Sequence, residues 1–209
     1  VAKVGQKLFF IGHTDGPAGL YEVRGYRVVP VQNIKAEVDI SRLFAASAIC
    51  SGYAITGHEF VTITVQGSGG LQAASWVFDA ISGEWSSRSS IGKPYYRGLF
   101  AVSTLASVYV TDAFTGILYK VNEQAFDEDG DPMEFEIISR HILNDGDHLT
   151  MHGIQIDVET GVGTATGQGA DPHCILCVSK DHGKTWIMER HPTLGKIGQY
   201  KSRAIEYQF

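Results

Sequence analysis

Residues 179–186 constrain the fold of this chain more than any other stretch. They read Ser-Lys-Asp-His-Gly-Lys-Thr-Trp. Asp181 can accept hydrogen bonds from backbone N–H groups of a turn, as Asp does in Asx-turns, and Gly183 can adopt the positive φ that a tight turn needs. The apolar residues 175–178 predict the incoming strand, and Trp186 is expected to resume the second strand and to pack its ring over the hairpin. The sequence predicts a β-hairpin built on Ser179, Asp181, Gly183, Thr185 and Trp186.

The rest of the chain predicts many short strands. Its β-rich runs are separated by turn residues, and 24 of its 209 residues are glycine. Three loosely similar modules lie at residues 8–29, 53–85 and 99–121, at a spacing near the roughly 40–50 residues of propeller blades. We predict an all-β protein, with propeller-like β blades over residues 1–147 and a C-terminal β unit with the hairpin over residues 148–209.

Two segments depart from this strand pattern. Residues 34–49 can hold a short helix, because Ile40, Leu43 and Phe44 have helical spacing. Residues 159–169 have the composition of an exposed loop. We expect this loop, together with the acidic run at residues 127–132, to contact partner proteins.

The candidate metal and redox sites are weak. Cys174 and Cys177 form a C-x-x-C pair, but residues three apart in a strand face opposite sides, so both are interpreted as small buried apolar residues. His148 and His152 would lie about 13 Å apart in a strand, too far for one metal ion. The acidic run lacks the ligand spacing of an EF-hand; a solvated turn is the main interpretation, and a partner-facing loop or weak cation site is the alternative. No nucleotide-binding loop is present, and we predict no catalytic residue, cofactor or metal.

The net charge of −6 argues against a surface whose main task is to bind nucleic acid. An acidic wall along which DNA slides is compatible with this charge. No apolar run approaches 18 residues, so no membrane span is predicted.

The pattern of residues 179–186 is that of an Asp box, which recurs in sialidases, other propellers and phage structural proteins. Residues 195–203 then read G-x-I-G-x-Y-x-x-R, and a Gln-Gly-x-Asp-Pro segment precedes the box at residues 168–172. Together these segments resemble the C-terminal signature of the packaged-DNA stabilisation, or head-completion, proteins of short-tailed phages. The signature residues after the box are Gly195, Gly198, Tyr200 and Arg203. Departures from the family pattern are His182, where Gly is more frequent, and Tyr207, where Trp is frequent.

The resemblance implies a structural virion protein of the phage tail, made in the cytoplasm of the bacterial host. It implies a hexameric ring below the portal that closes the channel and stabilises the packaged DNA, which the protein contacts only indirectly. The implied partners are portal-adaptor ring proteins, the tail needle and tailspike proteins, with no membrane. Since proteins of this family are considerably longer, we expect the chain to be part of a longer protein.

Two alternatives remain open at this point. A sialidase-like propeller enzyme or carbohydrate-binding module would share the Asp box, but that chemistry needs an arginine cluster, and neither Arg190 nor Arg203 can be tied to one. Sialidases also repeat the box over several blades, whereas this sequence has one. The second alternative is a cellular propeller scaffold.

Overall fold

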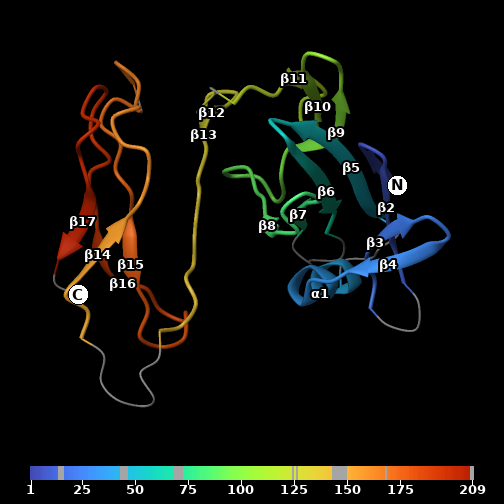
Figure 1. Cartoon of the computed structure of the whole chain (residues 1–209), viewed down its shortest axis with the longest axis horizontal. Coiled ribbons are helices and arrows are strands. Elements are labelled where there is room, and N and C mark those ends of the chain that lie inside the picture. The colour runs from blue at the N-terminus through green and yellow to red at the C-terminus, as the bar shows by residue number, and fades with distance from the viewer. Residues whose placement is uncertain are drawn as a thin grey trace. The chain divides into compact units, whose positions relative to one another are not determined.

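The computed structural model describes residues 1–13, 17–42, 47–67, 73–123, 125, 127–142, 150–167 and 169–207. The chain divides into two units, Val1–Glu134 and Phe135–Phe209, called here the N-terminal and the C-terminal unit (Figure 1). The predicted boundary between residues 147 and 148 lies outside the described residues and stays a prediction. His148 and Gln168 also lie outside them, as do Leu43 and Phe44 of the expected helical segment.

The N-terminal unit contains three successive antiparallel sheets, in each of which every strand pairs with its neighbour in sequence. The first sheet has four strands: β1 (Ala2–Val4), β2 (Lys7–Gly12), β3 (Gly19–Arg24) and β4 (Arg27–Val31). The second also has four: β5 (Ala48–Ile55), β6 (His58–Val65), β7 (Ala74–Asp79) and β8 (Trp85–Ser87). The third has three: β9 (Gly98–Ser103), β10 (Val108–Asp112) and β11 (Leu118–Lys120). A two-stranded hairpin follows, with β12 (Asp127–Glu128) and β13 (Asp131–Pro132).

The predicted helix is confirmed as α1 (Ile34–Arg42), which connects the first two sheets. Asn33 caps it, because its Oδ1 accepts a hydrogen bond from the N–H of Ala36 at 3.0 Å. Two buried side chains, Ala36 and Ile40, face the core.

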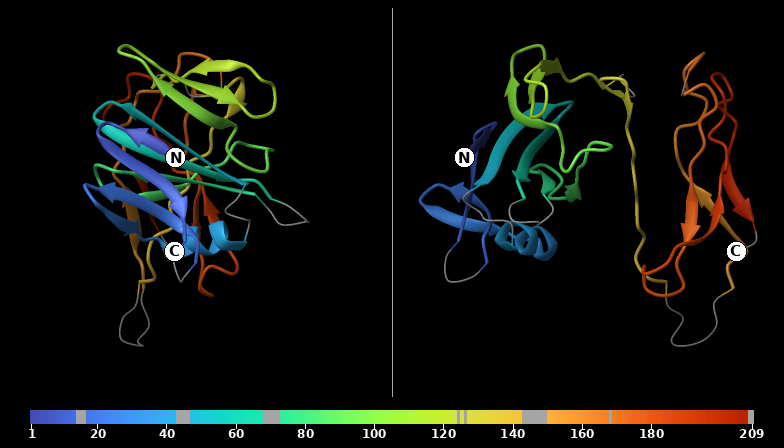
Figure 2. Two further views of the ribbon diagram at one scale, coloured as in Figure 1. Left: turned by 90° about the vertical axis from the view of Figure 1, so that its right-hand side faces the viewer. Right: turned by 180° about the vertical axis from the view of Figure 1, so that it is seen from behind.

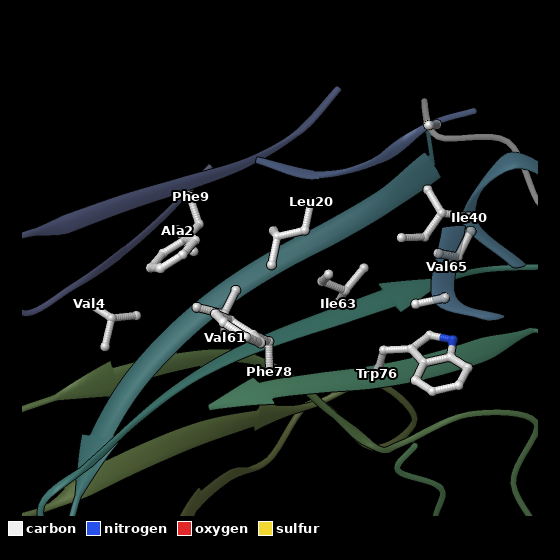
Figure 3. Close-up of a cluster of buried hydrophobic side chains, with 12 residues drawn as sticks. Ala2, Val4, Phe9, Leu20, Ile40, Val61, Ile63, Val65, Trp76 and Phe78 are labelled. Atoms are coloured by element: carbon white, nitrogen blue, oxygen red, sulfur yellow. The ribbon is translucent and has the colours of Figure 1, made fainter. Parts of the chain in front are cut away.

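The core of the N-terminal unit lies between the first two sheets and is closed by α1 (Figure 3). Phe9 and Leu20 from the first sheet meet Val61, Ile63 and residues of β7 from the second. Full burial of side chains of this size contributes about 1.5–3 kcal/mol each, so this interface is the main source of stability in the unit. Its members are Ala2, Val4, Phe9, Ala18, Leu20, Ala36, Ile40, Val61, Ile63, Val65, Trp76 and Phe78.

The first strands of the three sheets are neighbours: β1 packs beside β5, and β5 beside β9 (Figure 2). Gly52 permits the first contact, because a Cβ there would lie 2.2 Å from Cγ2 of Val4. The N–H of Ala101 donates to Ser51 Oγ at 2.7 Å across the second contact. The chain is thus mostly β, as predicted. The described residues show three sheets with adjacent first strands and no closed propeller.

The C-terminal unit contains two small antiparallel sheets (Figure 1). One pairs β14 (Gly153–Ile156) with β17 (Ala204–Tyr207), and the other pairs β15 (Leu176–Val178) with β16 (Ile187–Arg190). Arg190 Nε lies 3.5 Å from Glu206 Oε1 and links the two sheets.

Candidate functional site

Residues 179–186 connect β15 to β16 as a tight turn organised by one carboxylate. Asp181 Oδ1 accepts hydrogen bonds from the N–H groups of Lys184 at 3.0 Å and Thr185 at 2.8 Å, and Oδ2 accepts one from Thr185 Oγ1 at 2.6 Å. Ser179 Oγ donates to Asp181 Oδ1 and accepts from the N–H of Gly183, both at 2.8 Å. Gly183 has φ of +82°. Ser179, Asp181, Gly183 and Thr185 therefore lie together in one network.

This network sets the charge state of the turn. The hydroxyl and amide hydrogen bonds from Thr185 lower the pKa of Asp181 to about 2, helped by Ser179 and Lys184. The carboxylate is ionised at neutral pH, and both of its oxygens are occupied by the turn itself. Its geometry is that of a folding element, because the side chains of Ser179, Asp181 and Thr185 bond to one another and to the turn backbone.

Trp186 is placed differently from the expectation. It lies immediately before β16, which begins at Ile187, and 47% of it remains exposed. The residue beyond Ile187, Met188, has φ of +57°, which interrupts the alternation of β16. The indole is therefore part of the surface of the hairpin.

The second signature segment, residues 195–203, is hydrogen-bonded to the backbone of Gly161 and is separate from the 179–186 turn. Gly195 and Gly198 both have positive φ, +82° and +86°. The N–H of Gly198 donates to Gly161 O at 3.0 Å, and the N–H of Gly161 donates to Leu194 O at 3.2 Å. Gly161 is buried, and a Cβ on it would lie 2.8 Å from the backbone of Gln199. The expectation that all of residues 159–169 form an exposed loop is wrong at this point, because Gly161 anchors the segment.

Tyr200 and Arg203 complete the predicted signature, and both are exposed. Thr160 Oγ1 donates to the carbonyl oxygens of Tyr200 at 3.4 Å and Ser202 at 3.2 Å, so the backbone here is held while the Tyr200 ring is free. The sequence signature thus splits into two separate structural elements: the 179–186 turn, and the glycine-rich segment held by Gly161.

The C-terminal unit has few buried apolar side chains, so its interior is thin. The paired registers place Ile154 and Ile156 on one face of their sheet, opposite Glu206 and Ala204. Of the large hydrophobic residues described in this unit, none is buried. Exposed ones include Phe135, Ile137, Ile138, Ile142, Ile175, Ile197, Tyr200 and Tyr207. The unit therefore leaves most of its large apolar side chains exposed.

The N-terminal unit contains a turn that occurs twice. The sequence Asp-Ala-Ile-Ser-Gly starts at Asp79 and Asp-Ala-Phe-Thr-Gly starts at Asp112. In each, Oδ1 of the Asp accepts from the N–H two residues later, at 3.0 Å and 2.6 Å, and its own N–H donates to the carbonyl five residues later, at 2.9 Å in both. The glycines have φ of +77° and +72°. The modules that contain these turns could be identified from the sequence. The shared role of the two Asp side chains was missed, although the repeated five-residue pattern indicates it.

Each of these aspartates is buried and has its own basic partner. His58 Nδ1 lies 2.7 Å from Asp79 Oδ2. Burial alone would raise the pKa of Asp79, but hydrogen bonds from Ile81, His58 and Ser82 outweigh it and lower the pKa to about 2. Arg97 holds Asp112 through both Nε, at 2.8 Å, and Nη2.

The acidic run at residues 127–132 closes over Arg97. Arg97 Nη1 donates to Glu128 O at 2.9 Å, and Nη2 lies 3.5 Å from Asp129 Oδ2. Tyr119 donates its hydroxyl proton to the same Asp129 oxygen at 2.7 Å. The run is a solvent-exposed hairpin turn, as interpreted from the sequence, and it also contacts a buried guanidinium that sequence reasoning overlooked. Carboxylates held in this way are not arranged around a cation site.

Within the described parts of the chain, no three His, Cys, Asp or Glu side chains converge as a metal site would require. Likewise, no helix among those residues is long and apolar enough to cross a membrane. Cys50, Cys174 and Cys177 are free thiols, and burial raises the pKa of Cys50 to about 11.

Comparison with known families gives one match. Residues 134–207 match the family described as Bacteriophage P22 Gp10, beta-sandwich. The C-terminal unit is a phage P22 Gp10-type domain. The match covers nearly the whole of that unit, including both signature elements and both sheets. No curated protein matches the chain.

The Gp10-type domain decides between the functional alternatives. The family matched by residues 134–207 is one of structural phage proteins of the tail and head-completion type, which belong to the virion tail and are not enzymes. The sialidase-like interpretation of the 179–186 turn is therefore dropped. The resemblance that the sequence showed after residue 167 is confirmed, and the match extends it upstream to residue 134.

Proposed function

We propose that this protein forms a ring below the portal of a short-tailed phage, where it closes the channel and keeps the packaged DNA in the head. The match of residues 134–207 to the Gp10 β-sandwich carries this proposal. The ring is hexameric and contacts portal-adaptor proteins on one side and the tail needle and tailspikes on the other. The net charge of −6 suits a wall that DNA passes without binding.

The N-terminal unit supplies blades of a β-propeller in this proposal. Three features support it: successive antiparallel meanders, first strands that neighbour one another in the order β1, β5, β9, and a turn repeated between modules. In a propeller, the first strands of consecutive blades surround the central channel, and adjacent blades bury their faces against each other. The core between the faces of the first two sheets supports this assignment.

The 179–186 turn acts as an Asp box whose task is to hold β15 and β16 in register. The hydrogen bonds to Asp181 and Ser179 support this role. Gly195 and Gly198 shape the second element, and the exposed Tyr200 and Arg203 are the members of the signature that can reach a partner. Tyrosine and arginine are enriched at protein interfaces.

DNA retention tests the proposal. Phage carrying a nonsense mutation in the gene should package DNA and then lose it, and a plasmid copy of the gene should restore retention. DNA accessible to nuclease outside the particles measures the loss. Particles that keep their DNA and remain infectious without this protein would refute the head-completion role.

A further inference from the structure

Residues 133–142 form an extended segment that has the sequence of a strand but pairs with no strand among the described residues. Met133, Phe135 and Ile137 alternate with Glu134 and Glu136, as in a half-buried strand. Phe135 is 87% and Ile137 77% exposed. Among the described residues, no backbone hydrogen bond joins this segment to another strand. In Figure 1 the part of the segment that belongs to the C-terminal unit runs apart from the two sheets of that unit.

The sheets of the same unit offer a matching edge. Within the described residues, β15 pairs with β16 alone, so one side of β15 has free backbone groups. The other outer strands are less suited: β16 has charged residues and the positive φ of Met188, and β17 has Glu206. The fourth, β14, has no charge either, but it begins with Gly153, and glycine weakens a strand. By contrast β15 and the residue before it, Ile175, contain no charge and no proline, and Ile175 is 67% exposed. Unprotected edges of this kind accept an added strand.

The segment is poorly placed to join β15 of its own copy. His141 stacks on His182, with ring centroids 5.1 Å apart, so the C-terminal end of the segment is held at the turn that follows β15. Running toward that turn, the segment would lie parallel to β15, in a unit whose described sheets are all antiparallel. A segment from a second copy has no such restriction and can pair antiparallel, which is the more stable arrangement.

We propose that residues 134–140 of one copy add as an antiparallel strand to the free edge of β15 in the next copy. Phe135 and Ile137 then cover the half-buried apolar residues of the neighbour's thin interior. Each copy has one donor segment and one acceptor edge. When each segment passes to the next copy and none is returned, the contact is head-to-tail, and such a contact closes into a ring where the rotation between copies allows it. This inference rests on the proposed ring and specifies how its subunits are joined.

Cysteine cross-linking tests the pairing. Cys177 lies in β15 and supplies the acceptor thiol, and Cys174→Ser removes its neighbour. Cys50 stays, because its raised pKa keeps the thiol protonated and unreactive. Into this background we would introduce Glu136→Cys, Ile137→Cys or Ile138→Cys, one at a time. The matched control is Leu105→Cys, a fully exposed position in the N-terminal unit.

Both phage tails and the purified chain would be oxidised with copper phenanthroline and analysed without reducing agent. We expect a ladder of covalent oligomers whose yield alternates along positions 136, 137 and 138, because successive side chains of a strand face opposite sides. Leu105→Cys should give at most the yield of the background without an added cysteine.

The outcomes separate this inference from the function on which it rests. Tails that contain the chain but show no cross-links, only links within one copy, or a yield without alternation would overturn the strand exchange and leave the tail function standing. Chains absent from tails that still form the alternating ladder in solution would overturn the function and leave the exchange standing. If the chain is absent from tails and the purified chain forms no alternating ladder, both the tail function and the strand exchange are wrong.

A proline variant gives a second readout. In Ile137→Pro the backbone N–H is lost, and that N–H has no partner within one copy among the described residues. The melting temperature of the purified monomer should stay the same, while ring formation should fall at least tenfold; Glu136→Gln, which keeps the backbone, should assemble normally. Equal assembly of both variants would contradict the proposal.

Discussion

Loss of the Asp112 carboxylate should destabilise the N-terminal unit more than a typical substitution. Asp112 accepts hydrogen bonds from Phe114 N–H at 2.6 Å and Thr115 N–H at 3.3 Å, and it neutralises the Arg97 guanidinium. The side chains of Arg97 and Asp112 are 9% and 0% exposed. Removing one partner of a buried pair costs about 3–5 kcal/mol, because the other charge is left in a poorly solvated site. We expect Asp112→Ala to lower the melting temperature of this unit by roughly 10–20 °C.

Matched variants separate the charge from the turn. Asp112→Asn keeps an oxygen for the two amides, but its NH2 group cannot accept the hydrogen bonds from Arg97, so the charge pair is lost while the turn is retained. The loss should be smaller than for Asp112→Ala, about 1.5–3 kcal/mol. Combining it with Arg97→Met should cost less than the sum of the single changes, because the two residues are coupled.

Tryptophan fluorescence can follow the N-terminal unit alone. Trp76 and Trp85 lie in this unit, and Trp186→Phe removes the only other tryptophan of the sequence. Urea unfolding of each variant in this background gives its free energy of unfolding. A loss below about 1 kcal/mol for Asp112→Ala, or additive effects in the double variant, would show that the pair is not a buried unit and refute the reasoning.

Four further predictions concern the other elements. The pKa of Asp79 is lowered to about 2, so this residue contributes stability that is complete above about pH 4 and is lost as the pH falls toward 2. Measuring the free energy of unfolding as a function of pH checks this, and a free energy that stays constant from pH 4 to 2 would contradict it. Asp181→Ala should lower the melting temperature of the C-terminal unit, followed by Trp186 fluorescence, and leave the N-terminal transition unchanged; an unaltered melt would remove Asp181 from its role in the turn. The purified protein should not hydrolyse a fluorogenic sialoside, and saturable turnover above a denatured control would count against a structural role. Deleting residues 165–167, which spares Gly161, should leave the circular dichroism spectrum intact but weaken particle assembly or DNA retention, and wild-type particles would show that this loop contacts no partner.

Local features of this chain could be predicted from its sequence, because they depend on neighbouring residues. A helix within residues 34–49 was predicted from the spacing of Ile40, Leu43 and Phe44; Ile40 lies in α1, and Asn33 caps the helix. The hydrogen bonds of Asp181 all fall within four residues, where turn chemistry is reliable. Features that depend on distant packing could not be predicted in this way.

Arg97 and Trp186 show where the sequence was insufficient. Arg97 binds Asp112, 15 residues away, and then the backbone of Glu128, so its burial appears only when three segments meet. The exposure of Trp186 depends on what covers the hairpin, which the local motif does not specify. The strand-like alternation of residues 133–137 is visible in the sequence, but only the structure shows that this segment pairs with no strand in the described part of the chain.

The position of this protein in the virion tests the central claim most directly. A cryo-electron microscopy reconstruction of the phage tail should contain the two-sheet C-terminal unit, with its 179–186 turn, in a ring directly below the portal and its adaptor. Density for this chain in that ring, present in every DNA-filled particle, is the result that we expect. A tail whose ring is complete without this chain, or a chain found only outside the virion, would contradict the account.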